Sequence, residues 1–200
     1  YHGWHDWYLS TNLNSDKNLD GHLLPGLQPN GVPRGLTGTT LPFDYNNIGQ
    51  LEKLIKANHG KIAAIKMEVS RNKGPEDNYL QKVRDLATEN NIILIFDECT
   101  SGFREIFGGL HKKYGVEPDL AVFAKALGNG YAISACIGRK KIMQAAQQTF
   151  ISSTFWTERI GPAAALKTLE VMQREKSWEK ISQIGKGISE RWKLLAEKYE

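Results

Sequence analysis

The sequence predicts an α/β fold in which a mostly parallel central sheet is flanked by helices in three layers. The first observation is two short uncharged runs, Ile92–Phe96 and Leu120–Ala124, because such runs are typical of parallel strands buried on both faces. The second is their spacing. Asp97 and Lys125, which follow the two runs, are separated by about the length of one βαβ unit of roughly 30 residues, so both should lie at the same edge of one sheet.

Helix and strand patterns alternate through the middle of the chain. Ile48, Leu51, Leu54 and Ile55 recur at helical spacing, and Gly60 suits the end of that helix. An acidic start at Pro75-Glu-Asp precedes a second apolar stripe of this kind. The expected order is a loop over 9–43, a helix over 47–57, a strand over 62–67, a helix after Pro75, strands over 92–96, 120–124 and 134–138, and helices over 140–148, 160–172 and 178–200.

Composition excludes several classes of protein. The 200 residues are 40% hydrophobic and 24% charged, with a formal net charge of +4 spread along the chain, which is typical of a globular protein without a nucleic-acid stripe. No apolar run reaches the roughly 18 residues of a membrane span. Cys99 and Cys136 lie beside apolar runs without a CxxC pattern, so we expect a reduced, cytoplasmic protein. The chain opens without Met inside a motif, and we expect it to be an internal piece of a longer protein.

Lys125 and Asp97 are the side chains best suited to chemistry, because ligand sites in open α/β sheets lie outside the carboxyl ends of the strands. Gly128 and Gly130 let the backbone after Lys125 approach a ligand closely. A lysine amine can form an imine with the aldehyde of pyridoxal 5'-phosphate (PLP), and a carboxylate can keep its ring nitrogen protonated. Taken singly, Lys125 is more readily explained as a solvated lysine, and Asp97 as a cap of the next turn. The pair at this spacing favours PLP chemistry.

Five segments, taken together, resemble the class III aminotransferases. The most specific are Phe96-Asp-Glu-Cys-Thr-Ser-Gly-Phe-Arg104 and Pro118-Asp-Leu-Ala-Val-Phe-Ala-Lys125-Ala-Leu-Gly-Asn-Gly130. Tyr1-His2-Gly3, and Ser153-Thr154-Phe155 with Pro162-Ala-Ala-Ala-Leu166, match in the same order. Within that class, the chain most resembles the glutamate-1-semialdehyde 2,1-aminomutase branch. The resemblance implies PLP-dependent transferase fold type I, with residues 1–175 as part of the large PLP-binding domain and 176–200 as a helix leading to a small C-terminal domain.

The resemblance also implies roles for individual residues. Lys125 would form the internal aldimine and then move a proton between the substrate and the cofactor, and Asp97 would keep the ring nitrogen protonated. Tyr1 and Cys99 would hold the ring plane, while Thr154 would bind the phosphate of the partner subunit, which implies a homodimer with shared sites. The expected cofactor-binding residues are Tyr1, His2, Glu68, Asp97, Cys99, Lys125 and Thr154.

These residues favour a transaminase of small-molecule biosynthesis, acting on an amino donor and a carbonyl acceptor. An aminomutase would use the same residues, although Trp156 and Thr157 replace glycines that are usual in that family. A nucleotide-binding Rossmann domain is an alternative, but Leu127-Gly-Asn-Gly130 lacks the third glycine of that fingerprint. A PLP-fold binding protein or an inactive fragment remains the non-catalytic alternative. No metal site is expected, because His2 and His5 lack a third ligand.

Overall fold

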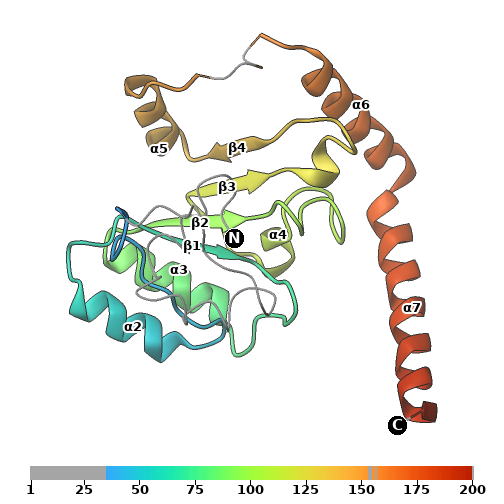
Figure 1. The fold of residues 1–200 in the computed structure, drawn as a ribbon, viewed down its shortest axis with the longest axis horizontal. Coiled ribbons are helices and arrows are strands. Elements are labelled where there is room, and N and C mark those ends of the chain that lie inside the picture. Colours follow the sequence, from blue (N-terminus) through green and yellow to red (C-terminus); the bar gives the residue numbers. More distant parts are fainter. Residues whose placement is uncertain (1–34, 153–154, 156, 200) are drawn as a thin grey trace. The chain divides into compact units, whose positions relative to one another are not determined.

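A computed structural model describes residues 35–152, 155 and 157–199 of the chain (Figure 1). The chain divides into two compact units between Leu54 and Ile55. In the first unit the described residues lead into helix α2 (Ile48–Ala57), which runs across this boundary. All remaining elements belong to the second unit. The separate division that the sequence predicts at residue 175 stays a prediction.

The second unit is built on a four-stranded sheet in the order β1-β2-β3-β4 (Figure 1). Strands β1 (Ala64–Glu68), β2 (Ile93–Asp97) and β3 (Leu120–Phe123) are parallel, whereas β4 (Ala135–Gly138) is antiparallel to β3. The predicted strands and the mostly parallel sheet are therefore confirmed. In this register Glu68 lies opposite Asp97, and Asp97 lies opposite Val122, so all three mark the same edge of the sheet.

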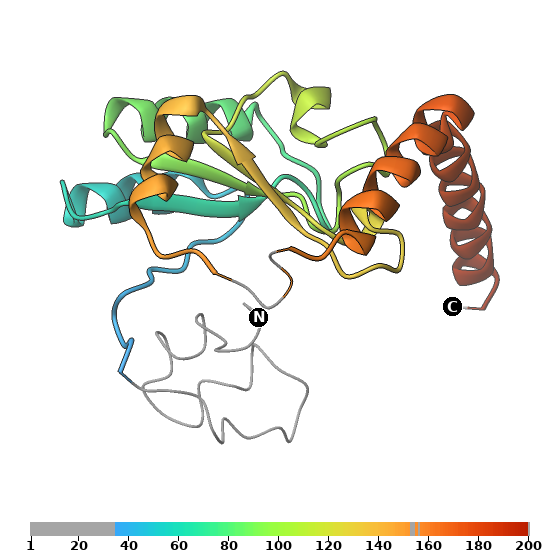
Figure 2. The same cartoon turned by 90° about the horizontal axis from the view of Figure 1, so that it is seen from above.

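The helices follow the predicted order with one addition. Helix α3 connects β1 to β2, and the short helix α4 connects β2 to β3; both lie on the same side of the sheet (Figure 2). The sequence patterns did not predict α4, because four residues are too few to show a period. The bounds are α3 (Tyr79–Glu89), α4 (His111–Tyr114), α5 (Lys140–Ala145), α6 (Ile160–Glu175) and α7 (Ser177–Tyr199), with 3-10 turns η2 (Lys125–Leu127) and η3 (Ala146–Gln148).

The core lies on the face of the sheet that α3 and α4 cover. Alternate strand residues point into it, and all six are buried: Ile65, Met67, Leu94, Phe96, Ala121 and Phe123. The intervening residues of β2 and β3, such as Ile95 and Val122, are only half-buried by the described part of the chain. The expectation that these strands are buried on both faces is therefore wrong for the described residues, and charged side chains can reach the second face.

The last two helices differ in how they pack. Helix α6 contributes Ala165 and Leu169 to a cluster with Ala121, Phe123 and Leu127, which fixes the helix beside the end of β3. Helix α7 has no buried residue, although Trp178 at its start contacts Phe107 with ring centroids 5.4 Å apart. Within residues 35–152 and 157–199, no helix combines the length and the apolar character that crossing a membrane requires.

Candidate cofactor site

Lys125 reaches from the end of β3 to the loop that follows β2. It is the first residue of η2, and its backbone is in the left-handed region, with φ of 45°. Its Nζ donates a hydrogen bond of 2.9 Å to Oγ1 of Thr100. Thr100 lies three residues after Asp97, so the amine and the carboxylate stand at neighbouring strand ends, as the βαβ spacing predicts.

Asp97 is held by a partner on each carboxylate oxygen. Oδ2 accepts a hydrogen bond of 2.7 Å from Nζ of Lys66 on β1, and Oδ1 accepts one of 3.1 Å from the backbone N–H of Cys99. Burial acts to raise the pKa of Asp97, but these hydrogen bonds and the charge of Lys66 outweigh it and hold that pKa below its ordinary value. Asp97 is therefore an anion at neutral pH.

Cys99 lies close to both charged groups, Asp97 and Lys125. Burial, its hydrogen bond to Asp97 and the charge of that carboxylate raise the pKa of the thiol to about 11, against the opposing charges of Lys125 and Lys66. A neutral thiol is a small, soft and largely apolar surface. Such a side chain can lie against an aromatic ring without adding a charge to the site.

Glu68 lies beside this group at the end of β1. Its Cα is in register with that of Asp97, and its Oε2 is 3.6 Å from a guanidinium nitrogen of Arg71. The structure thus brings together four of the predicted residues: Glu68, Asp97, Cys99 and Lys125. The other three, Tyr1, His2 and Thr154, lie outside the described residues, and their roles stay predictions.

A buried carboxylate directly after Asp97 supports the loop on the opposite face. Glu98 is fully buried; its Oε1 accepts the backbone N–H of His111 at 3.0 Å and lies 2.8 Å from Nδ1 of the same histidine, while Oε2 accepts the hydroxyl of Ser101. Burial acts to raise the pKa of Glu98, but these hydrogen bonds and the N–H of Leu110 lower it below its ordinary value.

Sequence reasoning missed this role of Glu98. The sequence signal that indicates this role is strand alternation. When Asp97 points to one face of the sheet, the next residue, Glu98, points to the other. A carboxylate placed there must find donors, because an unpaired buried charge is costly. Gly109 makes room for them, since a Cβ at that position would stand 2.3 Å from the His111 ring and 2.9 Å from Oε1 of Glu98.

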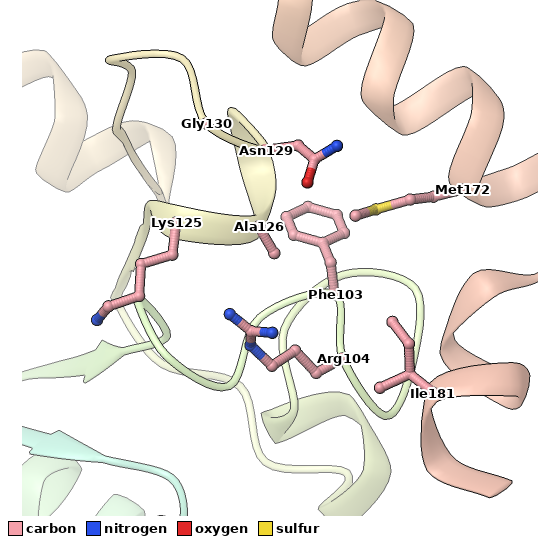
Figure 3. A pocket seen from close by; sticks show the side chains of 8 residues that line it. All are labelled: Phe103, Arg104, Lys125, Ala126, Asn129, Gly130, Met172 and Ile181. Atoms are coloured by element: carbon pink, nitrogen blue, oxygen red, sulfur yellow. The ribbon is translucent and has the colours of Figure 1, made fainter. Parts of the chain in front are cut away.

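A second feature beside Lys125 is a cavity of about 330 Å³. In Figure 3 the aromatic ring of Phe103 and the side chain of Met172 face into it, whereas the Lys125 side chain extends away from them toward the strand ends. Arg104 also lines the cavity, and its Nε donates a hydrogen bond of 2.7 Å to the backbone carbonyl of Thr100. Arg104 therefore fixes the loop that receives Lys125, which matches a supporting role better than substrate binding.

The donor set fits PLP. A pyridine ring needs an anionic acceptor for its N–H, and the ionised Asp97 is one; an aldehyde needs a primary amine, and Lys125 is one. Cys99 lies close to both and offers an uncharged surface. The residues present are thus complementary to both reactive ends of the cofactor.

Comparison with known proteins identifies the family. The sequence pattern of the family described as aminotransferase class-III matches residues 1–200. This chain is a class III aminotransferase family member. It is 36% identical over 193 residues to 3-aminobutyryl-CoA aminotransferase of Cloacimonas acidaminovorans, and this alignment covers 93% of this chain and 42% of that protein. It is 38% identical over 179 residues to glutamate-1-semialdehyde 2,1-aminomutase of Methanococcus vannielii, covering 85% of this chain and 40% of that protein.

Among solved structures, the PLP internal aldimine form of the FumI protein of Sphingopyxis sp. MTA144 is similar, with a TM-score of 0.63 and 29% identity over 66% of this chain and 34% of that one. The class III membership and this likeness confirm the fold type I assignment and indicate PLP as the cofactor. The chain spans about two fifths of the length of the curated relatives it matches.

Proposed function

We propose that the protein is an aminotransferase that uses PLP to move an amino group from a small-molecule donor to a carbonyl acceptor. The observation that carries this proposal is that Lys125 and Asp97 lie at the carboxyl ends of neighbouring parallel strands, with the Lys125 amine donating a hydrogen bond of 2.9 Å to Thr100. When bound, PLP supplies an aldehyde that takes up amines and a ring that accepts electrons from the substrate carbon.

Each residue of the site would have a separate role in binding the cofactor or in catalysis. Asp97 would accept the ring N–H and, as an anion, would keep that nitrogen protonated. Lys125 Nζ would hold the cofactor through its aldehyde and would be the base that moves a proton between the substrate carbon and the cofactor. Cys99 would support the ring, and the N–H of Cys99 keeps the carboxylate of Asp97 oriented. Glu68, opposite Asp97 at the end of β1, would border the cofactor.

A homodimer in the cytoplasm belongs to the proposal. Support for the dimer is the motif Ser153-Thr154-Phe155, whose threonine hydroxyl in this family binds the phosphate of the other subunit. Support for a reducing compartment is that Cys99 and Cys136 are both free thiols.

Aminomutase activity is the second candidate, because the Methanococcus vannielii aminomutase is 38% identical to this chain. The two activities differ in what they consume. An aminomutase converts one aminated aldehyde without a separate acceptor, whereas an aminotransferase needs a donor and an acceptor.

The test is a donor screen on the protein at its natural length, with conversion of PLP to pyridoxamine phosphate as the readout. Lys125→Ala should slow this half-reaction about 10²- to 10⁴-fold, the usual contribution of a positioned acid–base group. Lys167→Ala is the control, because Lys167 is an exposed lysine on α6 whose Nζ pairs with Glu170 at 2.7 Å. A Lys125→Ala protein that reacts as fast as this control would refute the proposal.

A further inference from the structure

Asp97 already has a cationic partner, and that partner is not Lys125. Lys66 lies on β1, one strand away, and its Nζ contacts Oδ2 of Asp97 at 2.7 Å. The Cα of Lys66 pairs with Ile95, two residues before Asp97, so both side chains project from the same face of the sheet. The lysine side chain is 41% exposed and the aspartate 21% exposed, so the pair is reachable from that face.

The charged residues described beside Lys66 already have other partners. Glu68, next along the same face of β1, has the guanidinium of Arg71 within 3.6 Å. The amine of Lys125 donates to Thr100 instead. In the described part of the site, Lys66 therefore acts on Asp97.

A pyridinium N–H that approaches Asp97 meets a carboxylate with both oxygens engaged. Oδ1 holds the backbone N–H of Cys99, which is fixed by the chain, and Oδ2 holds the Lys66 ammonium. A carboxylate has about four acceptor positions, so space is not the obstacle. The obstacle is charge, because two cations that share one anion at hydrogen-bond distance repel each other.

We propose that Lys66 is a positioning residue that holds Asp97 in place before the cofactor binds and then competes with the cofactor's ring N–H for Oδ2. This inference rests on the proposed PLP site and goes beyond it. Because Lys66 competes for Oδ2, the ring nitrogen contributes less to the affinity for the cofactor than it would if Asp97 had no other cationic partner.

The test compares PLP with 1-deazapyridoxal 5'-phosphate, which has a ring C–H in place of the nitrogen. The measured quantity is the ratio of the two dissociation constants, deaza compound over PLP, for the apoprotein at its natural length. In Lys66→Met the ring N–H no longer competes, and the deaza compound leaves Oδ2 of Asp97 without a partner. Both effects raise the ratio, and we expect a rise of about three- to fivefold for a pair that is partly exposed.

Lys113→Met is the matched control. The Nζ of Lys113 lies 2.8 Å from a carboxylate oxygen of Glu105, and this ion pair does not involve Asp97. Its ratio should equal that of the wild type, and Lys66→Arg should stay near the wild type because it keeps the charge. An unchanged or lower ratio in Lys66→Met, with PLP still bound, overturns the competition and leaves the proposed function standing. Failure of wild-type protein to bind PLP overturns both.

A measurement on the wild type covers the case in which Lys66→Met does not fold. Acetylation of Lys66, followed by mass spectrometry, should be at least twofold faster with PLP bound than with the deaza compound bound, because only the ring N–H displaces the ammonium. The two ligands have the same shape and shield Lys66 equally. Equal rates of acetylation would overturn the proposal.

Discussion

Glu98→Gln is the substitution whose effect the structure defines most closely. The side chain is fully buried, so its oxygens depend on the protein alone. It accepts hydrogen bonds from the hydroxyl of Ser101 and the N–H of His111, and it lies 2.8 Å from Nδ1 of that ring. Gln keeps the shape but removes the charge and turns an NH₂ group toward one set of donors.

The loss can be estimated from these contacts. A hydrogen bond to a charged group contributes about 1.5–3 kcal/mol, and a neutral one about 1 kcal/mol. Losing one such bond and weakening the others should reduce the free energy of unfolding by about 3 kcal/mol. For a chain of this size, that corresponds to a fall in Tm of about 6–12 °C.

The assay is thermal or urea unfolding of both proteins as a function of pH. The pKa of Glu98 is lower in the folded state than the value of about 4.3 expected in the unfolded chain. Its contribution is therefore complete above that unfolded value and is lost as the pH falls through the folded one. The difference between wild type and Glu98→Gln should be full at pH 7 and shrink below about pH 4.

The control for this experiment is Glu117→Gln, on the other side of the same histidine. The Glu117 side chain is 70% exposed, and its Oε2 is 3.8 Å from Nε2 of His111. It should change the free energy of unfolding by less than about 0.5 kcal/mol. If Glu98→Gln were no more destabilising than Glu117→Gln, the role assigned to the buried carboxylate would be wrong.

Two further predictions concern packing and reactivity. Gly102→Ala should destabilise the protein by about 1–3 kcal/mol in urea unfolding, because the added Cβ would stand 2.7 Å from the Phe123 ring. The control is Gly185→Ala on α7, where an added Cβ has nothing within 4 Å, and it should be neutral or stabilising. Equal effects of the two substitutions would contradict the packing described. Cys99 should alkylate slowly, since a pKa of about 11 leaves roughly one thiol in a thousand ionised at pH 8. Mass spectrometry should find exposed Cys136 alkylated first, and faster labelling of Cys99 would contradict the environment described for it.

Much of the fold could be predicted because apolar runs and their spacing determine it. The strands over 92–96 and 120–124 were placed to within about a residue, since a parallel strand in a core excludes charge. Two features escaped prediction. Helix α4 is too short to show a period, and the half-covered second face depends on which helices pack where, which local patterns do not contain.

The candidate site could be predicted only where its residues end strands. Asp97 and Lys125 were placed at one edge because parallel strands share a direction. The Lys66–Asp97 pair was not found, because it depends on the register between β1 and β2, and a slip of one residue would move Lys66 to the other face. Glu98 was missed since its role depends on donors from a loop that is distant in sequence.

The most direct test of the central claim is borohydride reduction of the protein with PLP bound, followed by peptide mass analysis. The geometry predicts a mass gain of one reduced cofactor on the peptide that contains Lys125, and none on that containing Lys66. Attachment to Lys66 or to another lysine, or no attachment at all, would contradict the claim that Lys125 and Asp97 serve the same ring.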